Sequence, residues 1–104
     1  MMNIVAITAC PSGVAHTYMA AESLEQAAIA RGLTIKVETQ GALGAENEIT
    51  LDDVKNADVV IVTTDIELAG MSRFDGKIIV ETTVKKLVVS AAEILDAACD
   101  VAVA

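Results

Sequence analysis

The chain has 104 residues, of which 54% are hydrophobic, a formal net charge of −8 at pH 7, and two cysteines far apart in the sequence. This length predicts one domain over residues 1–104, and two distant cysteines argue against a disulfide scaffold or a zinc knuckle. Seven scattered Lys and Arg residues argue against nucleic acid as a partner, and because we find neither a signal peptide nor an apolar run near roughly 20 residues, we expect a soluble protein of the cytoplasm.

The first predicted elements are a buried strand and a long helix. The segment 3–8 is apolar on both faces, which is typical of an interior strand in a parallel sheet that helices cover on both sides. From about Ala15 to Arg31, apolar residues recur at helical spacing opposite a polar face, which predicts a helix. Gly32 follows, and we expect it to end this helix.

The next segment predicts a strand, a loop and a short helix. Apolar and polar residues alternate over 33–38, the pattern of a strand with one less buried face, so we expect this strand at the edge of the sheet. Residues 41–49 predict a loop. Thr50 and Asp53 then form the pattern of a capping box, which predicts a short helix over 51–56.

The second half of the chain predicts two more strands and a final helix. Residues 59–62 are uninterrupted apolar residues, as in a second interior strand, and 77–80 predict its parallel neighbour. The residues between them, 63–76, are long enough for the crossover that parallel neighbours require. Apolar residues over 84–98 lie on one face of a last helix, and we expect residues 100–104 to be a frayed end.

Alternating strands and helices predict an α/β fold, a three-layer α/β/α sandwich with a four-stranded parallel sheet in the order 2-1-3-4. Right-handed crossovers produce this order when the strands at 3–8 and 59–62 form the interior pair. The chain then leaves these two strands toward opposite sides of the sheet. The C-terminal end of the first strand is therefore the topological switch point, where such sheets bind ligands, and Cys10 lies there.

The stretch ACPSGVAHT connects the first strand to the first helix. Cys10 follows the strand, and Pro11, Ser12 and Gly13 turn the backbone toward the helix N-terminus. Unpaired N–H groups and the positive end of the helix dipole converge there, and both favour a bound phosphate and a thiolate. The stretch predicts an anion-binding loop that contains a nucleophile, and its position in the fold opposes the alternative of an inert, buried cysteine.

Other residues of this loop have two or more possible roles. The hydroxyls of Ser12 and Thr17 can donate to a phosphoryl oxygen or cap the helix. Gly13 allows the backbone amides to approach an anion closely. The helix dipole disfavours a charged His16, whereas a nearby thiolate or phosphoryl group favours it. Catalysis, positioning and a simple surface role therefore all remain open for His16.

Several residues outside the loop are also candidates for a role. Cys99 lies beside the apolar face of the last helix, so we interpret it as structural. Asp65 and Glu67 follow a strand at the ligand edge, where their charge opposes direct phosphoryl binding but suits a partner surface. Gln40 and Gly41 end a strand at the same edge and either flank the site or turn the chain.

The spacing of Cys10, five residues, then His16 and Thr17 parallels the C-x5-R-S/T loop of cysteine-dependent phosphatases. Those enzymes bind the phosphate with both arms of an arginine, and a histidine cannot reproduce that geometry. No signature marks a carboxylate as the acid that would protonate a leaving alcohol. A loop that accepts a phosphoryl group on sulfur but is poorly equipped for hydrolysis suits a phosphoryl carrier.

The stretch ITACPSGVAHTYMAAE resembles the signature of the fructose-type enzyme IIB of the bacterial phosphoenolpyruvate-dependent sugar phosphotransferase system, whose usual form is close to ITACPTGIAHTFMAAE. The segments KVETQG, ITLDDVKNADVVIV and DIEL are also similar to that family, and the resemblance covers about residues 3–98. The differences at Ser12, Val14 and Tyr18 keep the hydroxyl, branched or aromatic character.

The resemblance implies that Cys10 accepts a phosphoryl group from a phosphohistidine of a fructose-type IIA protein or domain. Cys10 then passes it to fructose or a fructose-like sugar bound by the membrane-embedded IIC component. The family thus implies a cytoplasmic protein that meets the inner face of the membrane through IIC, with no metal or organic cofactor. The residues implied to bind the phosphoryl group are Pro11, Ser12, Gly13, Val14, Ala15, His16 and Thr17.

Two interpretations from other functional classes compete with the carrier. A small cysteine-dependent phosphatase or arsenate reductase would share the cysteine loop, and hydrolysis of an aryl phosphate would distinguish it. A non-catalytic flavodoxin-like binding module, in which Cys10 is incidental, would keep its function after alkylation of the thiol.

Overall fold

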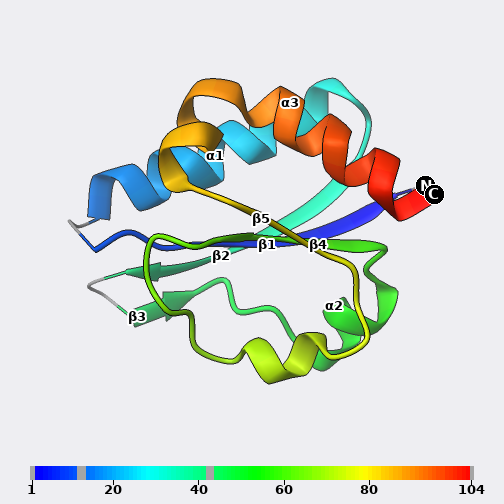
Figure 1. Ribbon diagram of the computed structural model, residues 1–104, viewed down its shortest axis with the longest axis horizontal. Helices are drawn as coiled ribbons and strands as arrows, with labels where there is room; N and C mark the ends of the chain where they lie inside the picture. The colour runs from blue at the N-terminus through cyan, green and yellow to red at the C-terminus, as the bar shows by residue number, and fades with distance from the viewer. Residues whose placement is uncertain (1, 12–13, 42–43, 104) are drawn as a thin grey trace.

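The computed structural model describes residues 2–11, 14–41 and 44–103, and within them a five-stranded sheet has the order β3-β2-β1-β4-β5 (Figure 1). The strands are β1 Asn3–Thr8, β2 Thr34–Gly41, β3 Gly44–Glu46, β4 Val59–Thr63 and β5 Ile79–Thr82. The helices are α1 Val14–Ala30, α2 Leu51–Asn56, the 3₁₀ helix η1 Met71–Phe74, and α3 Val84–Val103. No helix in the described ranges is both long and apolar enough to cross a membrane.

The predicted four-stranded, all-parallel sheet is wrong, because β3 adds an antiparallel strand beside β2. The four strands expected from the sequence are parallel and lie as β2-β1-β4-β5 within the larger sheet. The alternating pattern had predicted β2 at the edge of the sheet, and this prediction is wrong, because β2 lies between β3 and β1. β3 has three residues, all exposed, so no apolar periodicity reveals it, and Gly44 adopts a φ of 88° that favours glycine.

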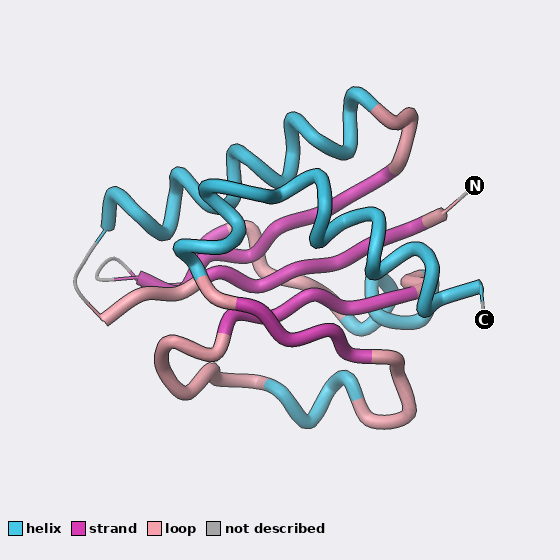
Figure 2. The backbone as a smooth tube through the Cα atoms, turned by 45° about the horizontal axis from the view of Figure 1, so that its top comes forward, coloured by secondary structure: helices cyan, strands magenta, loops and turns pink. Residues whose placement is uncertain are grey.

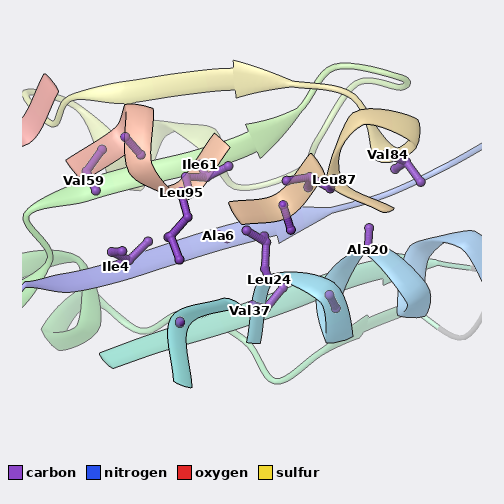
Figure 3. Packing of buried hydrophobic residues seen from close by; sticks show 14 residues of the cluster. Ile4, Ala6, Ala20, Leu24, Val37, Val59, Ile61, Val84, Leu87 and Leu95 are labelled. Carbon is purple, nitrogen blue, oxygen red and sulfur yellow. The ribbon is translucent and has the colours of Figure 1, made fainter. Parts of the chain in front are cut away.

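Helices lie on both faces of the sheet, as expected for a layered α/β fold. α1 and α3 lie side by side on one face, and α2 and η1 lie on the other (Figures 1 and 2). Under α1 and α3, alternate residues of β1 and β4 pack against both helices, with Leu24 and Leu95 at the centre (Figure 3). The intervening strand residues pack against Phe74 and α2 on the opposite face. Both faces of β1 and β4 are therefore apolar, which confirms them as interior strands.

The ends of two elements differ from the prediction. α3 continues to Val103 instead of fraying from residue 100, because its apolar face extends through Ala98 to Ala102, which packs against the core. β5 begins two residues later than expected. Lys77 closes the preceding loop instead, since its backbone N–H donates to the Phe74 carbonyl oxygen at 2.9 Å.

The predicted signals at the end of α1 and at the start of α2 are confirmed. Gly32 ends α1 with a φ of 66°. At the start of α2, the Thr50 N–H donates to Asp53 Oδ2 at 2.9 Å, and the Asp53 N–H donates to Thr50 Oγ1 at 3.1 Å, which completes the capping box. Hydrogen bonds from Lys36 Nζ, at 2.7 Å, and then from Thr50 lower the pKa of Asp53 to about 2.

Candidate functional site

Cys10 lies just past the C-terminal end of β1, in the middle of the sheet. From β1 the chain passes into α1 on one face, and from β4 it passes to η1 on the other face (Figure 1). This divergence places Cys10 at the topological switch point, as the sequence predicted. Its side chain is half-buried and packs against the cluster under α1 and α3.

A row of buried threonines crosses the four parallel strands next to Cys10, at the last residue of β1, β4 and β5 and two residues before the end of β2. Each of these residues follows, by two positions, a residue of the cluster under α1 and α3, so all four side chains lie on that face. β1 pairs with β2 through Thr8 and Thr39, and β4 pairs with β5 through Thr63 and Thr82. We call these four residues, Thr39, Thr8, Thr63 and Thr82, the threonine row.

Two members of the threonine row hold the backbone on either side of the Cys10 loop. Thr8 Oγ1 donates to the Thr17 carbonyl oxygen at 3.0 Å, which ties the end of β1 to the first turn of α1. Thr63 Oγ1 accepts from the Ala9 N–H at 3.0 Å and donates to the Ala9 carbonyl oxygen at 3.3 Å. Sequence reasoning missed this arrangement, although a threonine at the end of each interior strand was a visible signal.

A cavity of about 360 Å³ opens beside Cys10. Three parts of the chain form its walls: Cys10 with the first turns of α1, Asp65 after β4, and the start of α3. The structure thus brings Cys10, His16 and Asp65 together, as their predicted place at one sheet edge implied. The lining residues are Cys10, His16, Met19, Asp65, Val84, Lys85, Val88 and Val89.

The other predicted loop residues occupy different environments. Pro11 and Ala15 are exposed beside the cavity-lining residues. Thr17 is fully buried, and its carbonyl oxygen receives the hydrogen bond from the threonine row. Ser12 and Gly13 lie outside the described residues.

Asp65 holds the start of α3 at the wall of this cavity. Its Oδ1 accepts from the Val84 N–H at 2.9 Å, and Thr83 Oγ1 accepts from the Lys86 N–H at 3.2 Å. Asp65 therefore caps a helix, which the sequence did not reveal. α3 then bends at Ser90, where φ is −139° and ψ is 41°, and every α3 residue that lines the cavity precedes this bend.

Comparison with known proteins identifies the family of this chain. A family model described as the lactose/cellobiose-specific IIB subunit of the PTS system matches residues 5–97. The chain is also 58% identical over 88 residues to the PTS system fructose-like EIIB component 2 of Escherichia coli K12, a match that covers 85% of this chain and 83% of that protein. The chain belongs to the IIB family of the sugar phosphotransferase system.

Other relatives agree and confirm the resemblance to fructose-type IIB proteins. The PTS system fructose-specific EIIB'BC component of Rhodobacter capsulatus is 45% identical over 97 residues, which are 93% of this chain and 17% of that longer protein. A crystal structure of a predicted fructose-specific IIB from Escherichia coli superposes with a TM-score of 0.93 at 43% identity, covering 100% of this chain and 92% of that one. This IIB chain therefore has a role in sugar phosphotransfer.

Gln40 of this IIB chain clamps the loop after β4 and does not line the cavity beside Cys10. Its Oε1 accepts from the Ala69 N–H at 2.9 Å, and its Nε2 donates to the Ala69 carbonyl oxygen at 3.0 Å. Gly41 pairs with Gly44 where β2 meets β3. The clamp steadies the loop that carries Asp65.

A buried ion pair between Glu38 and Arg73 also supports the loop after β4, on the sheet face that α2 and η1 cover. Glu38, only 1% exposed, accepts two hydrogen bonds of 2.8 Å from the guanidinium of Arg73 and one of 2.8 Å from the Ile49 N–H. Burial raises the pKa of Glu38, but hydrogen bonds from Arg73, Gln40 and Ile49 outweigh it and hold that pKa below its usual value. This ion pair could not be predicted from the sequence of the IIB chain, because Glu38 lies in β2 and Arg73 lies in η1.

Cys99 of this IIB chain lies far along α3 and packs against the apolar cluster, as the sequence predicted. Burial, and then the negative charge of Asp96, raise the pKa of the Cys99 thiol. Among the described residues, no three His, Cys, Asp or Glu side chains gather closely enough to hold a metal ion.

Proposed function

We propose that this IIB chain carries phosphoryl groups on Cys10 during sugar uptake. Cys10 accepts the group from a phosphohistidine of a fructose-type IIA protein or domain and donates it to fructose or a fructose-like sugar bound by IIC. The observation that carries this proposal is the position of Cys10, half-buried at the switch point, ahead of α1, on the wall of an open cavity. The carrier works in the cytoplasm and reaches the inner face of the membrane through IIC.

Both transfers are displacements at phosphorus. In the first, a sulfur lone pair of the Cys10 thiolate forms the S–P bond while the N–P bond of the donor breaks, and its electron pair returns to the imidazole ring. In the second, a sugar hydroxyl oxygen forms the O–P bond, its proton leaves to solvent, and the S–P bond breaks to restore the thiolate. The N-terminus of α1 favours the negative charge on the phosphoryl oxygens in both steps.

The side chains near Cys10 favour a carrier over a phosphatase. Both arginines of the chain form ion pairs elsewhere, Arg31 with Asp96 and Arg73 with Glu38, so neither is available for a bidentate phosphate clamp. His16 stands at the position of the phosphatase arginine and lines the cavity.

The wall of the cavity suits a protein partner. Met19 and Val89 are 47% and 75% exposed, and Val88 lies beside them. Exposed apolar side chains around a reactive thiol fit contact with a protein surface better than contact with a small, hydrophilic phosphate ester. The EIIB'BC name of the Rhodobacter capsulatus relative supports IIC as the partner that receives the group.

The decisive experiment uses phosphorylated fructose-type IIA and intact-mass measurement. One phosphoryl group should add about 80 Da to the wild type, and the adduct should map to Cys10. Cys10→Ser should accept nothing while keeping its thermal stability, because a serine hydroxyl is scarcely ionised at neutral pH and little packing changes. Equal labelling of the serine variant, or an adduct on His16, would overturn this mechanism. Rapid hydrolysis of a chromogenic aryl phosphate would favour the phosphatase.

A further inference from the structure

Lys85 lines the cavity that contains Cys10 and His16. We infer that Lys85 binds the phosphoryl group while it is on Cys10 and supplies the positive charge that the loop lacks in place of the phosphatase arginine. The inference rests on the proposed phosphocysteine. It adds a charged residue from the start of α3 to the site formed by Cys10 and the first turns of α1.

The helical geometry of α3 directs Lys85 toward this cavity. Residues three and four positions apart share one face of a helix, and Lys85, Val88 and Val89 all line the cavity. Lys86 is also exposed, but it is not among the lining residues. Two neighbouring lysines therefore have different relations to Cys10.

The charge of Lys85 has no structural use that the described residues reveal. The positive end of the helix dipole opposes a cation in the first turn, and no acidic residue lies in that turn of α3. In the described part of the chain, Lys36 forms an ion pair with Asp53, whereas Lys85 forms none. A lysine placed against the dipole, with no ion pair in the described part of the chain, is suited to bind an anion that arrives from outside.

Asp65 makes such a cation necessary. Asp65 lines the same cavity, and one of its carboxylate oxygens accepts from the Val84 N–H. A phosphoryl group on Cys10 would face this negative charge, and Lys85 is placed to offset it. Lysine suits a carrier because its ammonium is a point charge on a flexible stem, without the bidentate grip of arginine.

The first test uses inorganic phosphate alone, with no partner protein. Phosphate should protect Cys10 from iodoacetamide, with the labelled site identified by peptide mass so that Cys99 is scored separately. Lys85→Gln should raise the phosphate concentration for half-protection roughly tenfold, the loss expected for one charge-assisted contact. Lys86→Gln, which changes the net charge equally, should shift it by less than about twofold, and Lys85→Arg should restore protection.

The second test measures the rate of adduct formation from phosphorylated IIA. If the wild type forms no adduct, the proposed function fails. If the wild type forms it and Lys85→Gln matches the wild type in both tests, the inference about Lys85 alone fails. Equal losses of phosphate protection in Lys85→Gln and Lys86→Gln would also overturn the inference. Non-specific attraction of phosphate to the positive charge at the start of α3 would then explain the effect. Both residues are exposed, so unchanged melting temperatures should accompany either result.

Discussion

The hydroxyl of Thr63 makes both of its hydrogen bonds to the backbone of Ala9, immediately before Cys10. Thr63→Val keeps the shape of the side chain but leaves the buried N–H and carbonyl groups of Ala9 without this partner. We expect the free energy of unfolding, measured in urea, to fall by about 1–3 kcal/mol. Phosphoryl acceptance by Cys10 should slow as well, and Thr63→Ser should restore both properties.

Thr82 provides a matched control in the same row of threonines. It pairs with Thr63 across β4 and β5, and its Oγ1 is buried with no hydrogen-bond partner among the described residues. Thr82→Val should therefore leave the free energy of unfolding unchanged or raise it, since no bond is lost. A loss as large as that of Thr63→Val would show that burial, and not the Ala9 contact, determines both effects.

At the scale of elements, the ion pair of Glu38 and Arg73 joins β2 to η1 on the sheet face that α2 and η1 cover. Because the pKa of Glu38 is lower in the folded state than its usual value of 4.5, the pair stabilises the protein above that pH. The stabilisation is lost as the pH falls through the lower, folded-state pKa, since the unfolded chain binds the proton first.

Glu38→Gln tests this linkage. At pH 7 it should lower the free energy of unfolding by roughly 3 kcal/mol, because it leaves the charge of Arg73 partly buried without its carboxylate. The gap to the wild type should narrow as the pH is lowered toward 3. Asp96→Asn is the control, since Asp96 is 58% exposed in its pair with Arg31 and should matter little. A gap independent of pH would contradict the role of the Glu38 charge.

At the scale of the whole molecule, the two apolar clusters share one sheet, because β1 and β4 contribute alternate residues to each. We therefore expect the clusters to unfold together. Phe74→Ala, in the cluster on the face of α2 and η1, should lower the free energy of unfolding by about 3–5 kcal/mol. The urea transitions measured by Tyr18 fluorescence and by circular dichroism should shift equally. Tyr18 lies on α1, so separate midpoints would show that the two faces unfold independently.

Features that depend on neighbouring residues could be predicted from the amino-acid sequence. The apolar runs of β1 and β4, the glycine that ends α1 and the capping box of Thr50 are all local patterns. The same patterns, combined with the handedness of crossovers, correctly predicted that Cys10 lies at the switch point.

Contacts between distant side chains depend instead on how the elements pack. Glu38 and Arg73 are separated by 35 positions, and Ala9 and Thr63 by 54, so no periodicity within one element connects them. β3 escaped prediction because pairing with β2, and not an apolar face, makes it a strand. Lys85 reaches the cavity for a related reason. Its position depends on how α3 packs over the sheet, and that packing is a property of the whole core.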